Sequence, residues 1–147
     1  PGWNNPQMGK INDENYPKIV EAVKKSGVQR LLIVGGAGTL FVKPGVRVVD
    51  TGVIPDAIID GVRSLGNFYL NFLTKEHDLD WVFFSPAGAF EDADKGQRTG
   101  KFRLGKDDLI VDPATGTSHI SVQDYAIAMV DELEKPAHHQ ERFTIGY

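Results

Sequence analysis

The sequence predicts an α/β protein in which a parallel sheet carries helices on both faces, together with a small β insert. Two apolar runs without polar alternation, at residues 30–34 and 79–86, are typical of strands that are buried on both faces. Amphipathic segments with a 3.6-residue period alternate with these runs, which favours parallel βαβ connections. With 41% hydrophobic and 24% charged residues among 147, the chain has enough apolar material for one packed domain.

The first helix is predicted over residues 13–26. Asn12 or Asp13 can cap its start, and Gly27 suits the position just after its end. Pro17 is compatible with this helix only in the first turn. The apolar stripe that predicts the helix contains Tyr16, Ile19, Val20 and Val23.

A second helix is predicted over residues 55–75 and a third over residues 121–134. Ser121 and Asp124 form a capping-box pattern at the start of the third helix. A last strand follows over residues 142–146. The apolar stripe of the second helix contains Ile58, Val62, Leu65, Tyr69 and Phe72.

The segments between these elements are short and mixed in character. Residues 41–52 are interpreted as a small hairpin or an irregular excursion, and residues 87–100 as an exposed loop. Residues 102–104 and 109–111 are predicted to form two short strands around a turn-rich link. Three parallel strands make a thin sheet, so we expect further strands from an upstream segment to complete it.

Composition excludes several classes of function. The net charge of −4 argues against a non-specific nucleic-acid binder, which needs a surplus of Lys and Arg. There is no Cys, so a thiol nucleophile and disulfides are excluded. No apolar run approaches the roughly 18 residues of a membrane span, and no secretory signal is visible. We therefore expect a cytoplasmic protein with no nucleic-acid or membrane partner.

The chain begins with Pro1-Gly2-Trp3-Asn4-Asn5-Pro6, which is typical of a loop, and without Met. We expect a chain that begins inside a loop to be a fragment, a processed product or a partial sequence.

The glycines at 35, 36 and 38 follow the first strand, at the sheet edge where α/β proteins bind ligands. They do not form a dinucleotide phosphate turn, because G-x-G-x-x-G must lead directly into a helix, and Thr39 begins no helix pattern. The turn either lines a ligand crevice or is merely tight. The same alternatives apply to residues 85–87, which end the second strand and can also be a simple strand stop.

No residue pattern assigns a catalytic group. Acid catalysis by Tyr-x-x-x-Lys needs a Lys four residues after a Tyr, and Tyr16, Tyr69 and Tyr125 are followed there by apolar residues. The four histidines lack the spacing of metal ligands, so no metal site is expected. Ser121 is interpreted as a helix cap rather than a nucleophile.

Five segments together resemble the atypical short-chain dehydrogenase/reductase group, and more narrowly its NmrA-like, NAD(P)H-binding members. Many of these are labelled NAD-dependent epimerase/dehydratase or NADH-flavin reductase. The segments are LIVGGAGTL at 32–40, LDWVFFSPA at 79–87, RTGKFRLG at 98–105, ISVQDYA at 120–126 and QERFTIGY at 140–147.

The resemblance implies that residues 1–147 are the C-terminal portion of one Rossmann-type domain. An upstream βαβ portion would carry the glycine-rich phosphate turn, and NAD or NADP would span both portions. We therefore expect no tight cofactor binding by this chain alone. The absence of Tyr-x-x-x-Lys departs from the family pattern and puts ordinary alcohol/ketone hydride chemistry in doubt.

The resemblance also implies the site residues, and it assigns no catalytic residue. Tyr69 is counted on the substrate side, although its place in the helix stripe also predicts a core or interface residue. The cofactor-binding residues would be Gly2, Trp3, Gly35, Gly36, Ala37, Ser85, Pro86 and Ala87, and the substrate-binding residues Gly38, Thr39, Tyr69 and Gly88.

Two functions follow as hypotheses. One is an NAD(P)H-dependent reductase of a flavin, a quinone or another small carbonyl-type molecule. The alternative is an NmrA-like sensor that binds NAD(P)(H) without turnover. In either case a half-sheet leaves a strand edge exposed, so we expect the chain to form homo-oligomers or to associate through that edge.

Overall fold

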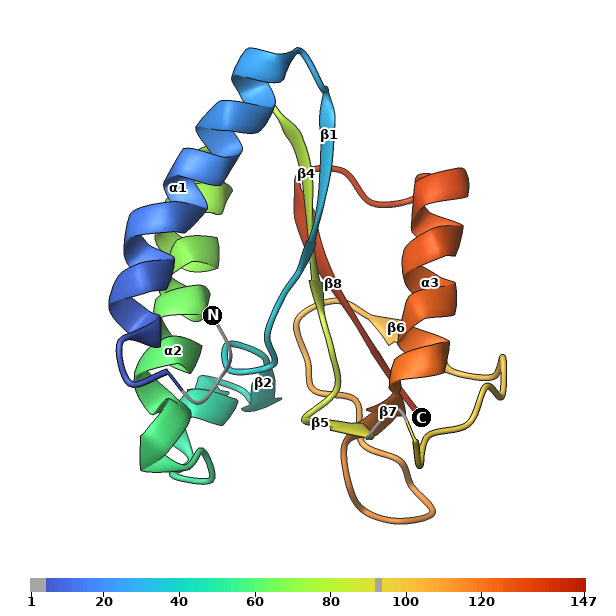
Figure 1. The fold of residues 1–147 in the computed structure, drawn as a ribbon. Helices are drawn as coiled ribbons and strands as arrows, with labels where there is room; N and C mark the ends of the chain where they lie inside the picture. Colours follow the sequence, from blue (N-terminus) through green and yellow to red (C-terminus); the bar gives the residue numbers. More distant parts are fainter. Residues whose placement is uncertain (1–4, 92–93) are drawn as a thin grey trace.

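A computed structural model describes residues 5–91 and 94–147. Figure 1 shows three layers, in which α1 (Met8–Ser26) and α2 (Asp56–Asn67) cover one face of the sheet and α3 (Val122–Glu134) covers the other. The predicted α/β architecture with helices on both faces is confirmed.

The main sheet has the strand order β1-β4-β8-β6. The strands β1 (Arg30–Val34), β4 (Asp80–Ser85) and β8 (Glu141–Gly146) are parallel, as predicted, with Leu32 opposite Val82. The short strand β6 (Arg103–Gly105) adds an antiparallel edge beside β8. β1 forms the other edge of this sheet, so one side of β1 has no neighbouring strand within it.

Helix α1 begins earlier than predicted. The prediction of Asn12 or Asp13 as its cap is wrong, because Gln7 is the N-cap and Asn12 is buried within the helix. The added turns pack on α2, where the Ser64 hydroxyl donates to the Gly9 carbonyl at 3.0 Å. Pro17 therefore lies in the helix interior. Gly27 ends the helix in the left-handed conformation, as predicted.

The second predicted helix is not continuous. After α2, the chain winds into a π-helical turn, η2 (Phe68–Phe72), and a 3₁₀ turn, η3 (Leu73–Lys75). The changed winding brings the ring of Tyr69 against Phe83 of β4, with the centroids 4.9 Å apart. An apolar stripe with a helical period does not reveal such a change, because it is compatible with either winding.

The connecting segments differ from the prediction in two places. The hairpin β2 (Phe41–Lys43) and β3 (Val46–Arg47), followed by the 3₁₀ turn η1 (Val48–Asp50), fits the interpretation of that region. The predicted exposed loop instead contains β5 (Ala89–Glu91), which pairs in parallel with β7 (His119–Ser121). No strand forms over 109–111, because the Leu109 amide donates to the Phe41 carbonyl outside any ladder.

The start of α3 confirms Ser121 as a cap, since its hydroxyl accepts from the Asp124 amide at 3.1 Å. The reciprocal half of the capping box does not form. The Ser121 amide donates to the Tyr147 hydroxyl at 3.3 Å, and the Asp124 carboxylate accepts from the amides of Thr99 and Gly100.

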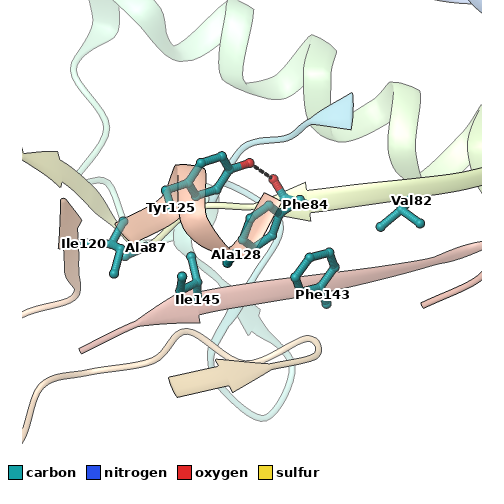
Figure 2. Packing of buried hydrophobic residues seen from close by; sticks show 8 residues of the cluster. All are labelled: Val82, Phe84, Ala87, Ile120, Tyr125, Ala128, Phe143 and Ile145. Carbon is teal, nitrogen blue, oxygen red and sulfur yellow. Dashed lines mark hydrogen bonds between the residues drawn. The ribbon is translucent and has the colours of Figure 1, made fainter. Parts of the chain in front are cut away.

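The core consists of two clusters, one on each face of the sheet. In the cluster under α3, Phe84 stacks between Tyr125 and Phe143 with centroid distances of 4.1 and 4.0 Å. Figure 2 shows the Tyr125 hydroxyl donating to the Phe84 carbonyl, at 2.7 Å. Tyr125 is thus a core residue.

Candidate functional site

A cavity of about 580 Å³ lies at the carboxyl ends of β1 and β4. This volume is within the range of small-molecule sites. It lies at the sheet edge at which α/β proteins bind ligands. Eight of the predicted site residues line it together, namely Gly35, Gly36, Ala37, Gly38, Thr39, Pro86, Ala87 and Gly88.

The turn after β1 contains glycine because it passes close to neighbouring side chains. A Cβ at Gly35 would lie 2.6 Å from the Phe83 ring, and a Cβ at Gly38 would lie 2.4 Å from Val62. Neither glycine has the left-handed backbone conformation. The Gly35 amide also donates to the Phe84 carbonyl at 2.8 Å, which extends the β1–β4 pairing. The turn is therefore tightly packed and also lines the cavity. A tight turn and a turn that lines a crevice, which the sequence offered as alternatives, are here the same turn.

The described lining of the cavity carries no charged side chain. Two of its side chains have a hydroxyl, Tyr16 and Thr39. Thr39 is buried, and its Oγ1 accepts from the Arg142 guanidinium at 2.6 Å. Tyr16 is half-buried and stacks on Phe68 with a centroid distance of 4.8 Å, and burial raises the pKa of its phenol.

Tyr69 lies apart from the other predicted residues. It lines a second cavity of about 400 Å³, together with Trp81 and Arg142. The Arg142 guanidinium covers the Tyr69 ring at 4.6 Å from its centroid. Burial raises the pKa of the Tyr69 phenol, although the Arg142 charge acts in the opposite direction.

Ser85 is the other described residue of the prediction that is not part of the lining. Ser85 is fully buried, and its carbonyl accepts from the Thr144 hydroxyl at 2.9 Å, so it supports the wall from behind. Gly2 and Trp3 lie outside the described residues.

Sequence reasoning missed the part of the lining that the helices contribute. Met8 and Tyr16 come from α1, and Ile58 and Val62 from α2. Their apolar spacing is the same as that of core positions, and no signal in the sequence separates the two roles. Phe90 also lines the cavity, and the sequence does not predict this because it predicts a loop where β5 forms.

Hydrogen bonds connect the segment that contains Gly88 and Phe90 to Ser118 and to β7. The Gly88 amide donates to the Ser118 hydroxyl at 2.9 Å. His119 lies between two carboxylates, with Nδ1 2.8 Å from Glu91 and Nε2 3.1 Å from Asp112. The hydrogen bonds to Glu91 and then Asp112 raise the pKa of His119.

Among residues 5–91 and 94–147, no group of three or more His, Cys, Asp or Glu side chains is arranged to hold a metal ion. None of the helices in the described part of the chain has the length and apolar character needed to cross a membrane.

Comparison with known proteins identifies the family. No family model matches the chain. A crystal structure of a Bacteroides thetaiotaomicron protein named "putative epimerase" is 50% identical, with a TM-score of 0.87, and the match covers 99% of this chain and 74% of that one. The chain belongs to the atypical short-chain dehydrogenase/reductase family. This family consists of NAD(P)-binding, Rossmann-like proteins, which agrees with the strand-edge cavity.

Two further relatives support this assignment. A Streptococcus pneumoniae structure named "putative NADH-flavin reductase" is 31% identical with a TM-score of 0.80, covering 97% of this chain and 66% of that one. The Bacillus subtilis protein named "Uncharacterized protein YwnB" is 43% identical over 129 residues. This match covers 86% of our chain, which spans only 59% of the length of YwnB.

A more distant match shares only the fold. A short-chain dehydrogenase/reductase from Veillonella parvula, solved in complex with NADP, is 15% identical with a TM-score of 0.62.

Proposed function

We propose that the intact protein is an NAD(P)H-dependent reductase and that this chain supplies the substrate-side wall of its site. The observation that carries the proposal is the cavity at the carboxyl ends of β1 and β4, because it collects eight residues expected there. One relative is named an NADH-flavin reductase, and a fold neighbour was solved with NADP.

We expect the flat ring of a nicotinamide to lie against the turn at the end of β1, where Gly35 and Gly36 line the cavity. In this proposal the cofactor side contains Gly2, Trp3, Gly35, Gly36, Ala37, Pro86 and Ala87, with Ser85 behind them. The substrate side contains Gly38, Thr39 and Gly88. Tyr69 has no place in it, because it lines the other cavity.

The phosphate-binding turn is assigned to a part of the protein upstream of this chain, so that residues 1–147 form the C-terminal part of one domain. In support, the chain spans only 59% of its curated relative. This chain alone should therefore bind NADPH weakly. Micromolar binding in a fluorescence titration of the 147-residue chain would argue against this division.

The acceptor is proposed to be a flavin, a quinone or a similar carbonyl-type ring. The nicotinamide would supply a hydride, which such rings accept with little acid–base help from the protein. The apolar lining would bind the acceptor and exclude water. The described lining contains no carboxylate, imidazole or amine, which an epimerisation by proton transfer at a sugar carbon would need.

The test is NADPH oxidation by the full-length protein with riboflavin, FMN and menadione as acceptors, followed at 340 nm. We expect turnover with at least one of them and a much lower rate without an acceptor. Absence of turnover with all three, and with NADH as well, would count against a reductase.

The second candidate is an NmrA-like sensor that binds the cofactor without turnover. The same uncharged lining favours it, because no described lining residue resembles the Tyr-x-x-x-Lys pair. Calorimetric binding of NADP⁺ and NADPH without any reaction would support the sensor. A partner protein released by the dinucleotide would support it further.

We also propose association through the free edge of β1. Val34 at the end of this strand is 57% exposed. An exposed apolar side chain at a free strand edge favours contact with another chain. A sedimentation experiment on the 147-residue chain should detect dimers or larger species, and a monodisperse monomer would contradict the proposal. A cytoplasmic location remains a prediction.

A further inference from the structure

Tyr16 differs from Tyr125 and Tyr147 in the hydrogen bonding of its hydroxyl. The Tyr125 hydroxyl donates to the Phe84 carbonyl at 2.7 Å, and the Tyr147 hydroxyl donates to the Asp124 carboxylate at 2.7 Å. The Tyr16 hydroxyl has no hydrogen-bond partner among residues 5–91 and 94–147. A half-buried phenol with no internal partner is available to a ligand.

The position of Tyr16 fits a ligand contact. It lies two turns after Met8 on α1, and both residues line the strand-edge cavity. Its ring is held by stacking on Phe68, with an interplanar angle of 22°. The other hydroxyl of the described lining belongs to Thr39, which is buried and accepts from the Arg142 guanidinium at 2.6 Å. Tyr16 is half-buried, so its hydroxyl is the more accessible side-chain donor of the described lining.

We infer that the Tyr16 hydroxyl donates a hydrogen bond to a carbonyl oxygen of the ring-shaped acceptor and thereby selects quinone- or flavin-like molecules over plain aromatic hydrocarbons. This inference rests on the proposed reductase function and names the group that recognises the acceptor. Burial raises the pKa of the phenol, so it stays protonated and able to donate at neutral pH.

Tyr16 would distinguish the acceptor from other flat rings by polarity rather than by shape. An apolar cavity binds any flat ring of suitable size through burial, so it cannot by itself prefer a carbonyl compound. An accessible donor in such a lining gives that preference, because its hydrogen bond is lost with a hydrocarbon.

The experiment compares two probes of nearly equal shape, menadione and 2-methylnaphthalene, which lacks the two carbonyl oxygens. Their dissociation constants are measured by calorimetry on the full-length protein with NADP⁺ present, so that no turnover occurs. The variants are Tyr16→Phe, which keeps the stack on Phe68, and the control Tyr69→Phe, whose ring lies in the other cavity. Melting temperatures check that both variants fold.

Tyr16→Phe should weaken menadione binding by about 2- to 12-fold, the loss expected for one neutral hydrogen bond, and leave 2-methylnaphthalene binding unchanged. Tyr69→Phe should change neither. Equal weakening of both probes would reduce Tyr16 to a packing residue and overturn the inference, as would no change for either probe. If the wild type binds neither probe, the proposed reductase function itself fails, and the inference fails with it.

Discussion

The Arg142 guanidinium donates to the Thr39 hydroxyl at 2.6 Å and so connects strand β8 to the turn that lines the cavity. The same guanidinium donates to the Asp107 carboxylate from Nε at 3.0 Å and from a terminal nitrogen at 2.6 Å. The cavity turn, the last strand and the loop after β6 are thus held by one buried cation. Loss of Arg142 should affect the cavity even though Arg142 does not line it.

Replacing Arg142 with Met should destabilise the protein by about 1–3 kcal/mol, because Thr39 is left buried without its donor. The measurement is urea unfolding of both proteins. Lys106→Met is the control, since the Lys106 side chain is 73% exposed and its ammonium lies 3.4 Å from the Glu141 carboxylate. That variant should lose less than about 1 kcal/mol. Equal losses for the two variants would mean that the buried contacts of Arg142 do not stabilise the fold.

The close packing of the glycine turn predicts a graded response to added methyl groups. Gly38→Ala places a Cβ 2.4 Å from Val62 and should cost about 1–3 kcal/mol through overpacking. Gly36→Ala places a Cβ 3.1 Å from the flexible end of Leu65 and should cost less. Thermal or urea unfolding measures both. A Gly38→Ala protein as stable as the wild type would show that the turn is loose.

His119 is expected to make the stability of the fold depend on pH. The hydrogen bonds to Glu91 and Asp112 raise its pKa in the folded state above the unfolded value of about 6.5. The protonated ring therefore stabilises the fold fully below pH ~6.5, and this contribution is lost as the pH rises through the folded-state pKa.

The difference in unfolding free energy between the wild type and His119→Gln should accordingly shrink between pH ~6 and pH ~9. Urea unfolding at both pH values measures it. His77→Gln serves as the control, because His77 is exposed and its ring bonds to no other described residue. A difference that grows with pH would give the linkage the opposite sign and contradict the assignment.

Asp124 holds the loop before β6 to the start of α3. Its buried carboxylate accepts from the amides of Thr99 and Gly100, at 3.0 and 2.9 Å, and from the Tyr147 hydroxyl. Asp124→Asn removes the charge, replaces one of the two acceptor oxygens with a donor and should cost about 1.5–3 kcal/mol. Tyr147→Phe removes one donor and should cost about 1 kcal/mol, measured by the same unfolding experiment. If the two variants ranked in the opposite order, the carboxylate would not be the centre of this network.

The sequence predicts those parts of the fold that depend on short-range patterns. The parallel strands β1 and β4 follow from their apolar runs, and the positions of Gly27 and Ser121 follow from cap chemistry. Pro17 was misplaced because the packing of Ser64 on Gly9 extends α1 beyond its local signals. The pairing of β5 with β7 joins segments 30 residues apart, which no local pattern reports.

The sequence also predicts only part of the candidate site. The strand-end residues could be predicted, because the carboxyl edge of a parallel sheet is a general binding place. Tyr16 could not, since its spacing with Val20 and Val23 is that of any core stripe. Tyr69 is predicted on the substrate side from the resemblance, and the structure places it at the other cavity, within the π-helical turn Phe68–Phe72 that the sequence does not predict.

The most direct test of the account is to fill the cavity and measure acceptor reduction. Ile58 lines the cavity from α2, whereas its neighbour Ile59 does not. NADPH oxidation with menadione is measured for full-length Ile58→Trp and for the matched control Ile59→Trp, after unfolding experiments confirm that both fold. If acceptor reduction takes place in this cavity, Ile58→Trp loses at least about tenfold in kcat/KM, equivalent to about 1.4 kcal/mol, while Ile59→Trp stays near the wild type. Equal activity of all three proteins would contradict the account, because acceptor reduction would then take place outside this cavity.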